Sequence, residues 1–175
     1  MNEVLKAIKE RRSVRKFKPD MPNREDIDMI IEAGLYAASG MGKQATKIIA
    51  ITNKDIRDKL SDDNRIIGGW PEGFDPFYGA PVILIVLYDK NCFTGIYDGS
   101  LVMGNLMLAA HSLGLGSIWI HRAKEEFEQD YWKLFLKNLG VEGEFEGVGH
   151  CALGYADTAL PEPPKRKEDR VIFLD

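Results

Sequence analysis

The chain has 175 residues, of which 45% are hydrophobic, with 23 basic and 27 acidic residues and a net charge of −4. These values are typical of one soluble globular domain spanning residues 1–175 and exclude a disordered or fibrous chain. Two cysteines are too few for a disulfide scaffold or a four-cysteine zinc site, and the longest apolar run, Val82–Leu87, is far shorter than the roughly 20 residues of a membrane span. We therefore expect a cytoplasmic protein without a metal or a membrane partner.

The charge is unevenly distributed. Residues 1–18 hold seven basic and two acidic residues, so the remaining 157 residues are strongly acidic. A basic N-terminus can bind nucleic acid, but the overall pI is near 5.5 and the sequence lacks zinc-finger and RNA-binding signatures. Glu3 and Glu10 also argue against a mitochondrial transit peptide. We expect no nucleic-acid partner.

The first half of the chain predicts two helices, a strand and a third, short helix. Apolar residues at helical spacing predict an amphipathic helix over residues 2–10. Asn23 is a plausible N-cap of a second helix whose apolar face continues to Ala38, before a Ser39–Gly42 stop. Residues 48–52 predict a β-branched strand and residues 55–60 a short helix.

Residues 68–81 combine turn-forming residues with large aromatic side chains and predict a loop. Exposed aromatics on a mobile loop often form a lid over a binding site. The alternative is a small cluster that packs within its own loop. The sequence leaves both open.

The second half predicts a buried strand and a buried helix. Residues 82–87 lack polar alternation, as expected for a central strand that is covered on both faces. Residues 101–113 are apolar nearly all round, which predicts a helix buried on all sides, in part by a partner subunit. Strands are expected at residues 117–121 and 147–154, with a helix over residues 127–135 between them.

The C-terminal segment contains Pro161, Pro163 and Pro164, then Lys165–Lys167, and ends in the apolar run Val171–Leu174. Four apolar residues after a proline-spaced tail need a surface to cover them. They either add an edge strand to their own sheet or reach another subunit. Together the elements predict an α+β domain with four or five strands.

Arg11, Arg12, Ser13 and Arg15 form the clearest candidate binding motif. Three guanidinium groups and a hydroxyl within five residues suit a phosphate or polyhydroxyl ligand. Alternation in an extended segment would place Arg11, Ser13 and Arg15 on one side. The alternative is a solvated basic turn.

Two further features could assist a ligand. Gly114–Ile120 joins the apolar helix to a strand, and its glycines allow close approach either to a flat ligand or to the neighbouring strand. Lys165–Lys167 could supply countercharge to an anion. Catalytic motifs such as GxSxG, HExxH and the P-loop are absent, and the three histidines and two cysteines are more typical of structural positions. If the protein is an enzyme, a bound cofactor is expected to supply the chemistry.

In identity and in order, these segments resemble the motifs of the nitroreductase family of flavin-dependent oxidoreductases. Residues 11–15 are similar to the family's R-R-S-x-R, and residues 38–44 stand where the family has P-S-x-x-N-x-Q-P-W. Residues 80–82 match A-P-V. Residues 105–110 and 113–120 are close to N-L-x-L-A-A and L-G-L-G-S-x-W-I. The resemblance covers nearly the whole chain, including the ending Leu153–Tyr155 with a basic, proline-rich segment after it.

The resemblance implies a central mixed sheet of four or five strands flanked by helices, in an intertwined homodimer with FMN at the subunit interface. It places the FMN phosphate and ribityl chain on residues 11–15, and the ring beside the strand that starts at Gly116, with backbone near flavin N5 at His121 and Arg122. The residues expected to bind the cofactor are Arg11, Arg12, Ser13, Arg15, Ser39, Gln44, Gly116, Ser117, Trp119, Ile120, Lys165 and Arg166. No catalytic side-chain acid or base is expected.

The function implied is ping-pong transfer of electrons from NADH or NADPH through FMN to a small acceptor such as a nitroaromatic or a quinone. Gly42, Ala45 and Thr46 depart from the family's Asn, Pro and Trp, which predicts a looser flavin edge. This departure motivates the alternative of a low-turnover flavin-binding protein for storage or sensing. A third hypothesis is a flavin enzyme with another acceptor, such as an enoate or a halogenated phenol.

Overall fold

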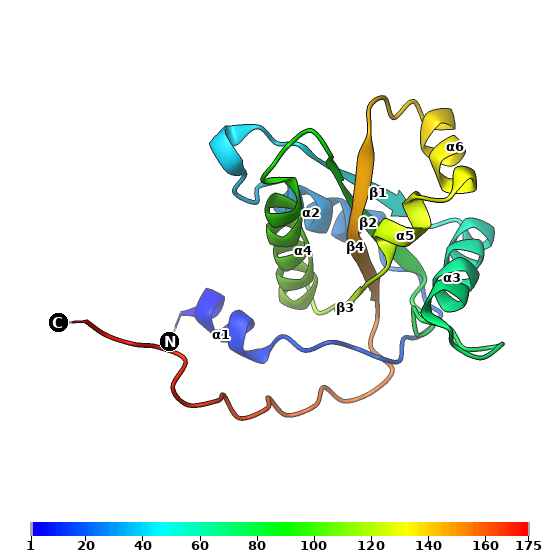
Figure 1. Ribbon diagram of the computed structural model, residues 1–175. Coiled ribbons are helices and arrows are strands. Elements are labelled where there is room, and N and C mark those ends of the chain that lie inside the picture. The colour runs from blue at the N-terminus through cyan, green and yellow to red at the C-terminus, as the bar shows by residue number, and fades with distance from the viewer. Residues whose placement is uncertain (1, 175) are drawn as a thin grey trace.

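A computed structural model describes residues 2–174, and its centre is a sheet of four strands between two layers of helices (Figure 1). The strands lie in the order β1-β2-β4-β3 and every neighbouring pair is antiparallel. Their bounds are β1 (Thr46–Ile51), β2 (Val82–Asp89), β3 (Gly116–Ile120) and β4 (Phe145–Gly154). The α+β class is confirmed. The predicted mixed sheet is wrong, because the four strands pair only in antiparallel fashion. In the described residues, parallel pairing is confined to an isolated bridge between Ser13 and Ser117.

The sequence of β2 explains how both faces of the sheet are buried. Val82, Leu84 and Val86 lie in the hydrophobic cluster on one face, and Ile83 and its alternating neighbours lie in the cluster on the other. All six side chains from residue 82 to 87 are fully buried. The predicted central strand is therefore confirmed, and its residues anchor two separate cores.

One face is covered by α2 (Arg24–Leu35) and α4 (Gly95–Ser112). Gly34 allows the two helices to approach closely, because a Cβ at this position would lie 2.6 Å from the Leu106 side chain. The prediction that α2 continues to Ala38 is wrong, since the chain turns away after Leu35 into a short 3₁₀ helix, η1 (Gly40–Gly42). Helix α4 starts before residue 101, in a polar stretch whose Asp98 suits the first turn.

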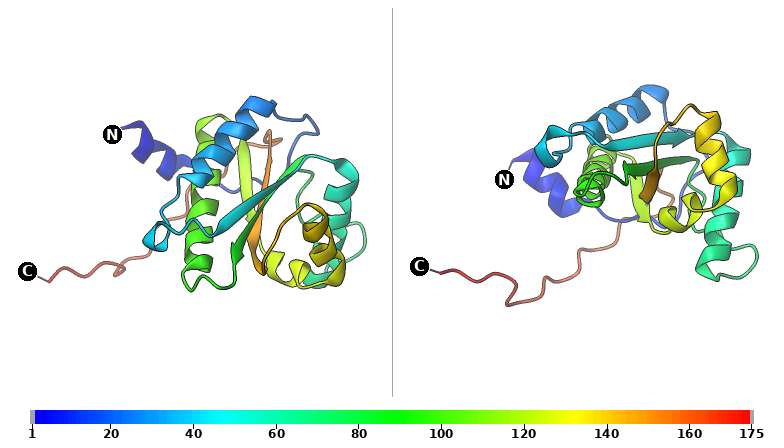
Figure 2. Two further views of the ribbon diagram at one scale, coloured as in Figure 1. Left: turned by 90° about the horizontal axis from the view of Figure 1, so that it is seen from above. Right: turned by 45° about the horizontal axis from the view of Figure 1, so that its top comes forward.

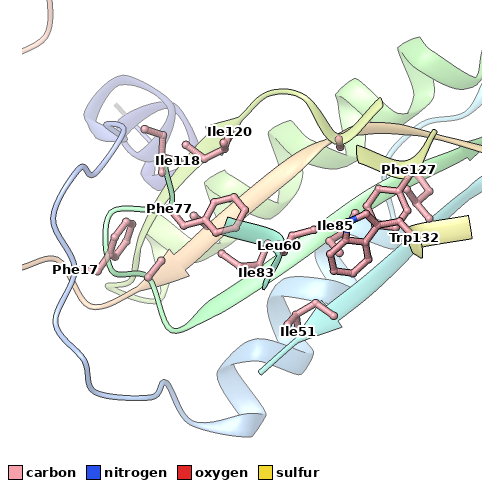
Figure 3. Packing of buried hydrophobic residues seen from close by; sticks show 14 of the residues in the cluster. Phe17, Ile51, Leu60, Phe77, Ile83, Ile85, Ile118, Ile120, Phe127 and Trp132 are labelled. Carbon is pink, nitrogen blue, oxygen red and sulfur yellow. The ribbon is translucent and has the colours of Figure 1, made fainter. Parts of the chain in front are cut away.

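The other face is covered by α3 (Lys54–Gly68), α5 (Ala123–Phe127) and α6 (Asp130–Asn138), as Figure 1 and the two views in Figure 2 show. Figure 3 shows the large side chains of this core, with Phe77 beside the sheet and Trp132 against Phe127. Helix α3 is longer than predicted because its second half is anchored by polar groups. The indole Nε1 of Trp132 donates to Asp63 Oδ2 over 2.8 Å.

The two ends of the chain lie outside the helix–sheet–helix layers (Figure 2). Helix α1 (Glu3–Glu10) has no buried residue, and its apolar side chains Val4, Leu5 and Ile8 are exposed. Residues 157–174 form no helix or strand, and the side chains of Val171–Leu174 are 70–94% exposed. The tail therefore does not form an edge strand on its own sheet. In the described part of the chain, helices fall short of the length and apolar character that a membrane crossing requires.

Candidate functional site

A cavity of about 230 Å³ lies at the C-terminal end of α4, between that helix, the start of β3 and the N-terminal segment. Its lining includes two pairs of predicted site residues, Arg11 with Arg12 and Gly116 with Ser117, together with His111. Residues about 100 positions apart in the sequence thus meet at one site. We call it the arginine cavity.

The N-terminal segment is held against β3 by backbone bonding and close packing. The amide of Val14 donates to the carbonyl of Ser117 over 3.1 Å, and the Val14 side chain is buried. A Cβ on Gly116 would lie 2.7 Å from Val14 Cγ2, so glycine is required for this approach. Gly116 thus performs close packing against a neighbouring segment, one of the two roles left open by the sequence.

The guanidinium groups of Arg11 and Arg12 are incompletely satisfied. Arg11 Nη1 and Arg12 Nε are buried without a hydrogen-bond partner, while Arg12 Nη1 donates to the carbonyls of Lys9 and Arg11 over 2.7 Å each. Neither side chain forms an ion pair with an acidic residue in the described range 2–174. Burial, followed by the adjacent charge of Arg12, lowers the pKa of Arg11. An anion in the cavity would relieve both effects, so these residues fit a phosphate group.

Other members of the basic motif differ from the predicted arrangement. Arg15 is exposed and does not line the arginine cavity, and Ser13 forms the bridge to Ser117. Buried Val14 lies between Ser13 and Arg15, and Arg12, rather than Arg15, lines the cavity together with Arg11. Cys151 lies in the core on the α2 and α4 side of the sheet, and burial raises the pKa of its thiol to about 12, with the charge of Arg11 opposing that rise. Cys151 is thus a protonated core residue at neutral pH.

Ser39 and Gln44 lie at the opposite end of α4. They line a separate cavity of about 150 Å³ together with Asp98, whose Oδ1 accepts from the Gly40 amide over 3.1 Å. Asp98 and His111 are separated by 13 residues of one helix, which corresponds to about 20 Å. A single chain therefore does not bring Ser39 and Gln44 to the arginine cavity.

The remaining predicted residues divide between the sheet faces and the tail. Trp119 packs with the α2 and α4 cluster, whereas Ile120 points into the opposite core, so only its backbone could face a ligand on the α4 side. Lys165 and Arg166 are exposed in the tail, where Lys165 Nζ lies 3.5 Å from Glu168 Oε1. Neither residue reaches the arginine cavity of its own chain.

The turn after β3 is fixed by groups that sequence reasoning missed. Asn64 of α3 is fully buried, and its Nδ2 donates to the carbonyl of His121 over 2.9 Å. Arg122 has a φ of 77°, in the left-handed region, and its guanidinium carbon lies 4.4 Å from the centre of the Trp70 ring. No spacing rule connects these positions. Asn64 lies in a polar stretch of α3, so its burial left no signal in the sequence.

The aromatic loop between α3 and β2 is fastened to α3. Asp75 accepts from Arg57, from Ser61 Oγ over 2.7 Å and from the amides of Phe77 and Gly79. Although burial alone would raise it, the pKa of Asp75 is lowered by its hydrogen bonds from Arg57 and Ser61. Phe77 is fully buried. Residues 75–79 thus pack within their own loop, which is the second of the two roles predicted for it.

Comparison with known proteins agrees with this architecture. The sequence model of the nitroreductase family matches residues 8–67 and 70–155. A Methanothermobacter thermautotrophicus protein whose name includes NAD(P)H nitroreductase is 34% identical over 121 residues, covering 67% of this chain and 60% of that protein. An FMN reductase [NAD(P)H] of Bacillus subtilis is 29% identical over 140 residues, covering 67% of this chain and 53% of the relative. The chain thus aligns with just over half the length of these two relatives.

The fold is shared with a solved nitroreductase. The crystal structure of a Bacteroides fragilis nitroreductase with bound FMN superposes with a TM-score of 0.91 at 29% identity and covers 100% of both chains. The chain belongs to the nitroreductase family.

Proposed function

We propose that the protein is an FMN-dependent oxidoreductase that takes electrons from NADH or NADPH and passes them, in a ping-pong cycle, to a small acceptor such as a nitroaromatic or a quinone. The observation that carries the proposal is that two buried guanidinium nitrogens, Arg11 Nη1 and Arg12 Nε, lack a hydrogen-bond partner in a chain of this family. The relatives named above support it through the flavin and nicotinamide in their names. FMN, when bound, supplies the chemistry of accepting a hydride and donating electrons.

In this proposal the chain binds and orients the cofactor. Arg11 and Arg12 neutralise the phosphate, with Ser13 and Arg15 beside them on the same segment. Gly116, Ser117 and Trp119 belong to the strand that would lie beside the ring, and Ile120 contributes backbone only. The backbone at His121 and Arg122 then borders the reacting edge.

We further propose that the working unit is a homodimer with the cofactor between the two subunits. Ser39 and Gln44 lie beside Asp98, about 20 Å along α4 from the His111 that lines the arginine cavity, so a second copy is needed to bring both groups to one ligand. Apolar surface for such contact is present on α1, on Tyr97 and Leu101 of α4, and on the tail, all of it exposed in the single chain. Lys165 and Arg166 would reach the phosphate of the partner by this route.

Reconstitution with FMN tests the proposal. After removal of free flavin by gel filtration, the protein should retain one FMN per chain and oxidise NADH or NADPH when a nitroaromatic or quinone acceptor is present. Retained flavin with negligible turnover over a panel of nitroaromatics, quinones, enoates and halogenated phenols would favour a flavin-storage or flavin-sensing protein. A protein that retains no flavin would contradict the proposal.

A further inference from the structure

The side chain of Arg122 is a cation without an anionic partner. Among residues 2–174 it forms no ion pair, and its guanidinium makes no hydrogen bond. Within the same range, its guanidinium carbon lies 4.4 Å from the centre of the Trp70 ring. The N–H donors of this guanidinium make no hydrogen bond within residues 2–174, and they match a carboxylate or phosphate in geometry.

The Trp70 ring that supports Arg122 is itself held in place. Gly68 allows the ring to lie flat against the end of α3, because a Cβ there would be 2.6 Å from Trp70 Cε3. The ring also packs against Phe74, with ring centres 5.1 Å apart, and Phe74 packs edge-on against Tyr78. A row of half-buried aromatic rings therefore adjoins the unpaired cation.

The backbone that carries Arg122 is fixed from two sides. Asn64 holds the carbonyl of His121. Helix α5, which starts one residue after Arg122, packs on β4 through the Gly147–Ala123 contact and through a fully buried pair in which Glu126 Oε2 lies 2.6 Å from His150 Nε2. A left-handed arginine in such a frame cannot swing away with a flexible loop, so its charge is presented at a defined place.

We propose that Arg122, supported by Trp70, binds an oxyanion carried by the flat small molecule that reacts at this site. The inference rests on the proposed function, which puts the backbone of His121 and Arg122 at the reacting edge of the cofactor. The ligand class is an aromatic or heteroaromatic compound bearing a carboxylate or phosphate. That oxyanion can belong to the electron acceptor or to the phosphates of the nicotinamide donor, because both occupy one site in turn.

A matched pair of acceptors isolates the acceptor's charge. The neutral donor 1-benzyl-1,4-dihydronicotinamide removes donor phosphates, and kcat/KM is then compared for 4-nitrobenzoate and the neutral 4-nitrobenzamide. In Arg122→Gln we expect the loss with 4-nitrobenzoate to exceed any loss with 4-nitrobenzamide by about 10-fold, as for one partly exposed charge-assisted contact. In the second arm, NADPH replaces the neutral donor and 4-nitrobenzamide is the acceptor, so that a loss in Arg122→Gln assigns the oxyanion to the donor.

An equilibrium measurement removes the dependence on turnover. Calorimetric titration of the FMN-loaded protein with benzoate, which cannot be reduced here, is compared with titration with benzamide. Arg122→Gln and Trp70→Leu should each weaken benzoate binding if the acceptor carries the oxyanion, and Arg122→Lys should be intermediate because it keeps the charge without the planar fork. Arg24→Gln, which removes an exposed arginine on α2, is the matched control.

The outcomes separate the inference from the proposed function. If the protein turns over 4-nitrobenzamide but Arg122→Gln alters neither arm, the inference is wrong and the oxidoreductase proposal stands. A loss in either arm, with Arg24→Gln unchanged, supports the inference. If the protein retains no FMN and oxidises neither donor, the proposed function fails and the inference fails with it.

Discussion

Replacing Arg11 by alanine removes a guanidinium that has no acidic partner in the described chain. Its Nη1 is buried without a hydrogen bond, and burial together with the charge of Arg12 lowers its pKa. Both facts mean that Arg11 contributes little to the stability of the protein without ligand. If the side chain binds the FMN phosphate, the same substitution must weaken flavin binding.

The expected effects of Arg11→Ala on flavin binding and on protein stability differ in size and direction. One charge-assisted hydrogen bond to a phosphate contributes about 1.5 to 3 kcal/mol, so Arg11→Ala should raise the Kd for FMN by about 10- to 100-fold. The free energy of unfolding of the flavin-free protein should change by less than about 0.5 kcal/mol or rise slightly, because an unsatisfied buried group is removed. Arg12→Ala should raise the Kd for FMN by a similar factor. Its stability should fall only by what the hydrogen bonds from Arg12 to the Lys9 and Arg11 carbonyls contribute.

Flavin fluorescence titration measures the Kd, and urea unfolding of the flavin-free protein measures stability. Lys6→Ala, an exposed basic residue on α1, is the control and should change neither quantity. An unchanged Kd in both arginine variants would show that the basic segment is a solvated turn. A large loss of stability in the flavin-free protein would refute the argument that the guanidinium groups of Arg11 and Arg12 are incompletely satisfied until an anion binds.

Three further predictions concern the frame of the site. Asp75→Asn should destabilise the protein by about 2 kcal/mol in urea unfolding. Because the Asp75 carboxylate has a lowered pKa in the folded state, the extra stability of the wild type should be complete above about pH 5 and should vanish as the pH falls through that lowered pKa. A stability difference that does not depend on pH would contradict this. Glu126→Ala should cost about 3 kcal/mol by leaving His150 buried without its partner, measured as a lower urea midpoint at unchanged slope; an unchanged midpoint would contradict it. Gly147→Ala should lower stability by about 1 to 3 kcal/mol, since the new methyl group meets the backbone of α5; thermal unfolding at the wild-type temperature would count against it.

The sequence predicted the layers of the fold well because they depend on apolar periodicity. The unbroken run Val82–Leu87 correctly predicted a strand between two cores. Helix α3 was predicted too short because Asp63 and Asn64 are buried through polar contacts with other elements, which local pattern does not reveal. Tertiary partners, rather than propensity, decide such positions.

The candidate site was predictable only where neighbouring residues form it. Arg11 and Arg12 are adjacent, and the structure brings them to Gly116 and Ser117 as the resemblance implied. The stacking of Arg122 on Trp70 joins a β–α turn to a distant loop, and no sequence spacing encodes it. Separation of Ser39 from the arginine cavity likewise follows from the length of α4.

Sedimentation velocity of the FMN-reconstituted protein, recorded at the visible absorption of flavin, tests the central claim most directly. A flavin site completed by two copies predicts that the flavin sediments at the mass of two chains, with one FMN per chain. Flavin that stays unbound, or that sediments at the mass of a single chain, would contradict the account.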